Sequence, residues 1–86
     1  MSSWKLHNVS GTQTTFARAI EGLDRIRAYV DYDQWEDEEV PLSYFWSVQD
    51  GSCGQILESA HVDGDKGLAA AQAAADAAVS RLFPGH

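Results

Sequence analysis

The sequence has a single cysteine, two prolines and no long apolar run. Cys53 has no second cysteine with which to form an internal disulfide or a cysteine-based zinc site. A membrane span needs roughly 18 consecutive apolar residues, so we expect no membrane partner. Residues 1–5 lack the apolar core of a secretory signal. These absences predict a protein of the reducing cytoplasm.

Lysine and arginine are absent between Arg27 and Lys66. That stretch contains ten carboxylates, whereas the two flanking segments together contain six basic and three acidic residues, which gives a net charge of −7. Such a field repels nucleic acid and attracts basic surfaces. We therefore expect no direct nucleic-acid partner.

The residue sets of catalysis and cofactor binding are also missing. A calcium loop beginning at Asp31 needs glycine at the position of Glu36 and glutamate at that of Leu42. No serine has a histidine and an acid at the spacing of a nucleophile set, and no glycine loop could cradle a phosphate. The histidines are too far apart for a metal site: His7, His61 and His86. We expect neither enzyme activity nor a metal or cofactor.

The length of 86 residues has room for one domain, spanning residues 1–86. An apolar fraction of 44% is ordinary for a globular protein. A chain of this size buries only about 60% of the surface that its unfolded form exposes. Its thin core leaves little room for a deep pocket, which favours a function at the surface.

Apolar and polar residues alternate cleanly over residues 25–33, which predicts a half-buried strand. Residues 14–20 would pair with it in a hairpin closed at Glu21-Gly22, and residues 4–9 are a candidate for a short first strand. The alternative for residues 16–29 is a helix, because apolar residues also recur there at spacings of three and four. The face of the strand expected to be buried carries Ile26, Ala28, Val30 and Tyr32.

Residues 42–49 and 55–62 predict a second hairpin around the turn at residues 50–54. Strict alternation puts Ile56, Glu58 and Ala60 on one face of this hairpin and Leu57 on the other, and it does not decide which of the two faces is buried. Residues 66–83 predict a helix, with residues 63–65 as cap candidates. Asp76 lies away from its apolar stripe, which is formed by Leu68, Ala71, Ala75, Val79 and Leu82. The order predicts an α+β fold, an antiparallel sheet of three to four strands (two hairpins) with one C-terminal helix packed on one face.

Aromatic rings alternate with carboxylates at the end of the third predicted strand and in the acidic loop after it. Aromatic residues are enriched in interface hot spots, and carboxylates steer basic partners and pair with arginine. The alternative is that the rings cap the sheet edge while the acids keep that edge soluble. The candidate protein-binding residues are Tyr29, Asp31, Asp33, Trp35, Glu36, Asp37, Glu38 and Glu39.

Two resemblances accompany these patterns. The C-terminal hairpin and alanine-rich helix, Ala73–Leu82, resemble the end of double-stranded-RNA-binding domains, but the region 65–70 has one lysine where that family has a cluster. The chain as a whole resembles small acidic phage and mobile-element proteins of the anti-CRISPR type. This resemblance implies an inhibitor in the host cytoplasm that docks on the basic channel of a CRISPR effector.

The leading hypothesis is a non-enzymatic inhibitor or adaptor that presents its acidic segment to the basic surface of a protein or ribonucleoprotein complex. The first alternative is a structural or assembly protein that acts as a homo-oligomer, such as a homodimer. The second is a divergent nucleic-acid binder that uses a basic patch of Lys5, Arg18, Arg25 and Arg27.

Overall fold

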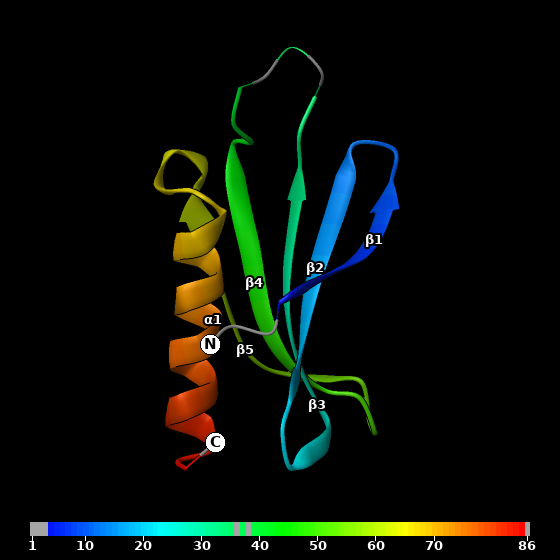
Figure 1. Cartoon of the computed structure of the whole chain (residues 1–86), viewed down its shortest axis with the longest axis vertical. Coiled ribbons are helices and arrows are strands. Elements are labelled where there is room, and N and C mark those ends of the chain that lie inside the picture. The colour runs from blue at the N-terminus through cyan, green and yellow to red at the C-terminus, as the bar shows by residue number, and fades with distance from the viewer. Residues whose placement is uncertain (1–3, 36, 38, 86) are drawn as a thin grey trace.

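The computed structural model describes residues 4–35, 37 and 39–85, in which the chain forms five strands, a short 3₁₀ turn and one long helix (Figure 1). The α+β class is confirmed. The sheet has five strands, not the predicted three to four, because residues 5–10 pair along their length with the second strand. In chain order the elements are β1 (Lys5–Ser10), β2 (Gln13–Ile20), β3 (Leu23–Asp33), β4 (Ser43–Asp50), β5 (Gln55–Asp63), η1 (Gly64–Lys66) and α1 (Leu68–Leu82).

The strands form one antiparallel sheet in the order β1-β2-β3-β4-β5, so each strand pairs with its neighbours in the chain. Tight turns at Gly11 and Gly22 join the first three strands, and both glycines have positive φ, 61° and 84°, which glycine adopts readily. Phe16 pairs with Val30 and Arg18 with Ala28. The helical alternative for residues 16–29 is therefore wrong.

One face of the sheet packs against α1, and the core lies between them. The helix lies along β3, β4 and β5, while β1 and β2 form the far side of the sheet (Figure 1). The alternation predicted for β3 is confirmed, because Ile26, Ala28 and Val30 are buried and Tyr32 packs beside them. The other face of the sheet has no helix over it in the described part of the chain, and we call it the open face.

Alanine is the main residue that α1 buries. Ala71, Ala75, Ala78 and Val79 have no exposed surface, and these short side chains let the helix lie close to β3 and β4. The predicted stripe is correct at its centre, but Leu82 remains 37% exposed. No helix in the described residues is long and apolar enough to cross a membrane.

The predicted start and polar side of the helix need correction. Gly67, with φ 89°, ends η1 and is the N-cap of α1, which has no side-chain capping bond; Asp63 and Asp65 therefore do not cap it. Asp76 is half-buried rather than turned away. Its carboxylate accepts hydrogen bonds from Arg18 Nη1 at 2.6 Å and from Trp4 Nε1 at 3.2 Å, which connects α1 to β2 and to the residue before β1.

A bulge in β5 settles the orientation of the second hairpin. Val48 pairs with Glu58 and Gln49 pairs with Ile56, so Leu57 is an extra residue on β5. The bulge interrupts strict alternation, and the prediction that Ile56 shares a face with Glu58 is wrong. Ile56 lies on the open face, 51% exposed, while Leu57 packs against the core.

Candidate functional site

One end of the molecule brings together the β1–β2 turn, the β3–β4 loop and η1 (Figure 1). We call it the acidic end, because six described carboxylates lie there and none of them forms an ion pair with a described residue. Lys66, in η1, also lies at this end. The six are Asp31, Asp33, Asp37, Glu39, Asp63 and Asp65.

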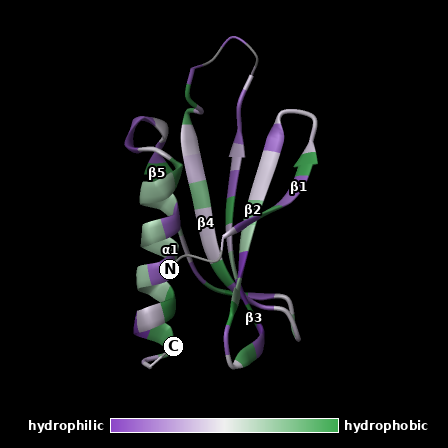
Figure 2. Ribbon diagram, viewed as in Figure 1, coloured by the Kyte–Doolittle hydropathy of each residue, from purple (hydrophilic) through white to green (hydrophobic). Residues whose placement is uncertain are grey.

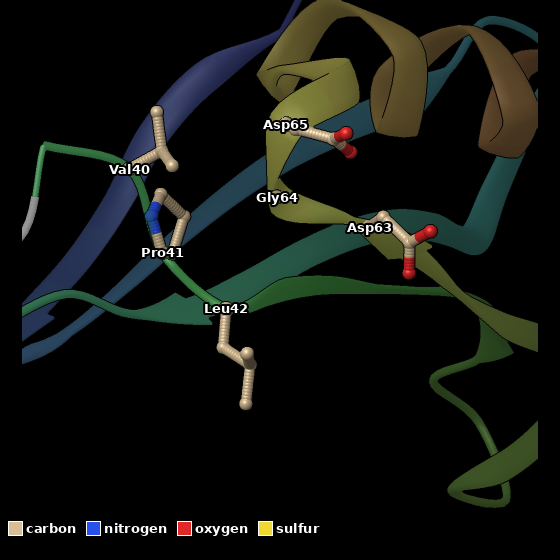
Figure 3. Close-up of a pocket in the computed structure, with 6 residues that line it drawn as sticks. All are labelled: Val40, Pro41, Leu42, Asp63, Gly64 and Asp65. Atoms are coloured by element: carbon tan, nitrogen blue, oxygen red, sulfur yellow. The ribbon is translucent and has the colours of Figure 1, made fainter.

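Two backbone hydrogen bonds hold the segments of the acidic end together. Gly64 N–H donates to the carbonyl of Leu42 at 3.0 Å, and Gln34 N–H donates to the carbonyl of Thr12, also at 3.0 Å. The first bond sets η1 against the β3–β4 loop around a hollow of about 460 Å³. In Figure 3 the Asp63 and Asp65 side chains both extend toward the right of the view, whereas the Leu42 side chain points downward, away from both carboxylates.

Part of the acidic end is built on the open face of the sheet. Asp31 pairs with Phe45 and Phe45 with His61 across neighbouring strands, and Ser43 pairs with Asp63 at the next position toward the loop. The Phe45 and His61 rings are 5.1 Å apart. Because the strands alternate, these side chains share one face. Asp31, Ser43, Phe45 and His61 line a hollow of about 260 Å³ together with Asp33.

Threonine hydroxyls from the β1–β2 hairpin orient the two strand carboxylates. Thr15 Oγ1 donates a hydrogen bond to Asp31 Oδ1, and Thr12 Oγ1 donates one to Asp33 Oδ1 at 3.2 Å. Each carboxylate has a second oxygen, and an ionised carboxylate has about four lone-pair positions. Both residues therefore keep acceptor capacity for a partner while their side chains are held in place.

Two carboxylates of the lysine- and arginine-free stretch lie elsewhere and are neutralised by the protein's own arginines. Asp50, at the end of β4, lies 3.4 Å from Arg25, and Glu58 pairs with Arg81 of α1. Hydrogen bonds from the Ser52 hydroxyl and then the Ser52 N–H, with a smaller effect of Arg25, hold the pKa of Asp50 below its ordinary value. The negative field is thus concentrated at the acidic end rather than spread over the whole stretch.

The structure places the predicted binding residues in two groups. Tyr29, Asp31 and Asp33 share the open face of β3, where the Tyr29 ring contacts that of His7. Trp35 does not belong to this face, because β3 ends at Asp33 and Trp35 lies in the loop after it, 60% exposed. Asp37 and Glu39 are exposed loop residues. Glu36 and Glu38 lie outside the described residues.

Sequence reasoning missed part of this end. Asp63 and Asp65 were interpreted as helix caps, and Phe45 and His61 were not considered as neighbours of Asp31. Leu42, the most exposed large apolar side chain of the described residues at 90%, was placed in a strand. Leu42 belongs to the β3–β4 loop itself, whereas strand pairing and the hydrogen bond from Gly64 N–H to Leu42 O bring the other four residues to this end. Their spacing in the sequence contains no signal of this arrangement.

The described residues of the acidic end offer oxygen acceptors and exposed apolar groups. Among the described residues, no three histidine, cysteine or acidic side chains are grouped closely enough to hold a metal ion. What the arrangement can do is attract and hydrogen-bond a cationic partner. Comparison of the chain with protein-family models, with curated proteins and with solved structures gives no match.

Proposed function

We propose that the protein is a non-enzymatic binding protein whose acidic end docks on a basic surface of a partner protein or ribonucleoprotein complex. The observation that supports this most directly is the set of six described carboxylates without a basic partner in the described chain. Arginines pair with carboxylates elsewhere in the fold, at Asp50, Glu58 and Asp76. The acidic end keeps its charge for an external partner.

Exposed apolar side chains in the same region supply contact energy that charge alone does not. Trp35 is 60% exposed and Leu42 is 90% exposed. A hollow of about 250 Å³ between them is lined by Asp33, Trp35, Leu42 and Ser43. Tryptophan is enriched among the residues that dominate binding energy, whereas carboxylates mainly govern the association rate and the choice of partner.

The class of partner follows from the sign of the charge. A channel or groove that binds nucleic acid is lined with lysine and arginine, so its charge is complementary to that of the acidic end. The acidic end would therefore compete with nucleic acid for this channel. The general resemblance to anti-CRISPR proteins makes a CRISPR effector complex the first partner to test. Inhibition would follow from occupation of the channel rather than from chemistry.

A pair of charge-reversed variants tests the proposal. Asp37→Lys with Glu39→Lys changes the acidic end, and Glu21→Lys with Asp24→Lys makes the same change in net charge at the β2–β3 turn. Binding to a purified CRISPR effector loaded with guide RNA is measured by calorimetry at 50 and 300 mM salt. If reversal loses about 3 kcal/mol of the coupling typical of close charge pairs, affinity falls about 100-fold.

The control variant is expected to bind within about threefold of the wild type, because exposed charges farther apart than a Debye length are screened. Wild-type affinity should fall as the salt concentration rises. Equal losses in the two variants would mean that net charge, and not the acidic end, governs binding. Failure of the wild type to bind at 50 mM salt would exclude this class of effector as the partner.

A further inference from the structure

In the described part of the chain, α1 lies along β3, β4 and β5 and reaches β2 through the Arg18–Asp76 pair, which leaves Leu6 and Val9 on the same side of β1 exposed. Leu6 pairs with Phe16, which pairs with Val30 in the core, so Leu6 belongs to this side. Val9 pairs with Thr14 on the same side, because a bulge between Leu6 and Asn8 adds a residue. The tip of β1 is correspondingly hydrophobic in Figure 2.

Leu6 and Val9 are exposed on an edge strand that has little of the usual protection by charge or proline. Leu6 and Val9 are each 58% exposed, and β1 pairs on one side only. Edge strands are commonly protected by charge or proline, but β1 contains Lys5 as its single charged residue and no proline. The opposite edge, β5, differs in that its Leu57 and Val62 pack against the core.

The same hairpin is free of negative charge. Residues 4–20 contain no aspartate or glutamate, although the chain as a whole has a net charge of −7. Arg18 is already paired with Asp76, which leaves Lys5 as the uncompensated charge. Two copies that meet through these strands bring no carboxylate of residues 4–20 into the contact, although the β1–β2 turn itself lies at the acidic end, so repulsion is smaller here than over the carboxylate-rich remainder of the chain.

We propose that a second copy of this chain covers Leu6 and Val9 in a two-fold contact between β1–β2 hairpins. A two-fold contact uses the same patch on both copies, so Leu6 and Val9 of one copy meet those of the other. Thr14 and Phe16, both partly exposed, lie beside them in β2. The contact uses none of the six carboxylates of the acidic end, although it lies beside the β1–β2 turn that belongs to that end.

The size of the surface predicts a weak dimer. A standard stable interface buries about 800 Å² on each partner, which would be roughly one seventh of the 5534 Å² surface of this chain. One side of a two-stranded hairpin provides less than that. We therefore expect association in the micromolar to millimolar range, increasing with salt as repulsion between the two negative copies is screened.

Sedimentation equilibrium from 10 μM to 1 mM, at 50 and 500 mM salt, tests the contact. The wild type is expected to approach the mass of a dimer at the highest concentration, and more so at high salt. Leu6→Lys with Val9→Lys should remain a monomer throughout. The control Ile56→Lys changes a residue of the opposite edge strand, β5, that is 51% exposed, and it should dimerise like the wild type. Wild-type protein that is a monomer at 1 mM, or a double variant that still dimerises, would overturn the proposal.

A second measurement uses only the wild type, so its result does not depend on whether the double variant folds. Amide chemical shifts are followed while the protein is diluted from 1 mM to 10 μM. The shifts that move with concentration should cluster at residues 5–10 and 13–16. Concentration-dependent shifts centred on β5 or on the β3–β4 loop would place the contact elsewhere and refute the assignment.

Discussion

Replacement of Gly64 by alanine should destabilise the fold and disrupt the acidic end together. A Cβ added at this position would lie 1.6 Å from the carbonyl oxygen of Pro41 and 2.7 Å from its carbonyl carbon. Ordinary contacts of a Cβ are 3.4–4 Å, so η1 and the β3–β4 loop would have to separate by about 2 Å. Both near atoms belong to the backbone, which cannot move aside as a flexible side chain could.

The cost has two parts. Overpacking of a close contact costs about 1–3 kcal/mol, and separation breaks the hydrogen bond from Gly64 N–H to Leu42 O, now 3.0 Å long, at about 1 kcal/mol. A loss of about 3 kcal/mol is large against the roughly 4–13 kcal/mol expected for a chain of this length. It corresponds to a fall in Tm of roughly 12–24 °C.

Urea unfolding followed by tryptophan fluorescence measures the loss. Gly51→Ala is the matched control, because its added Cβ would lie 3.3 Å from the Arg25 carbonyl oxygen, which a shift of a few tenths of an ångström relieves. We expect the control to lose less than about 1 kcal/mol. A Gly64→Ala variant within about 0.5 kcal/mol of the wild type would show that η1 is not held against the loop in this way.

Two further predictions concern ionised side chains. Asp76→Ala should cost about 1–2 kcal/mol of unfolding free energy, because it removes the hydrogen bonds from Arg18 and Trp4. Glu58→Gln changes an exposed ion pair and should cost under about 1 kcal/mol. Equal losses of the two variants in urea unfolding would contradict this difference. Ser52→Ala should raise the pKa of the Asp50 carboxyl toward its ordinary value, as measured by NMR titration. A lowered folded-state pKa stabilises the fold above the unfolded pKa, and this contribution is lost as the pH falls through the folded-state pKa. The variant's loss of stability should therefore be present at pH 7 and vanish once the pH falls below the folded-state pKa of Asp50.

The alternation in residues 25–33 predicted β3 and the face that it buries. Alternation determines the outcome there because a strand with one apolar face is stable in one orientation only. The alanine-rich segment likewise predicted α1 and its close packing, since alanine favours the helix and adds no bulk. Where such patterns were short or broken, in residues 5–10 and at the Leu57 bulge, the number of strands and the face of Ile56 could not be predicted.

The acidic end shows the same division. The absence of lysine and arginine between Arg27 and Lys66 can be read directly from the sequence, and it predicted that this stretch attracts basic surfaces. Which carboxylates stay without an ion pair in the described chain depended on pairing between distant residues, such as Glu58 with Arg81. The approach of Asp63 to the β3–β4 loop depended on the register of β4 with β5 and on the contact at Gly64.

By itself, then, the sequence determined the local elements and the total charge, because both are properties of neighbouring residues. Tertiary structure alone decided which charges are neutralised, which apolar residues stay exposed and which segments meet at one end. These are long-range outcomes: each depends on strand pairing and helix packing between residues far apart in the chain, where local periodicity carries no information.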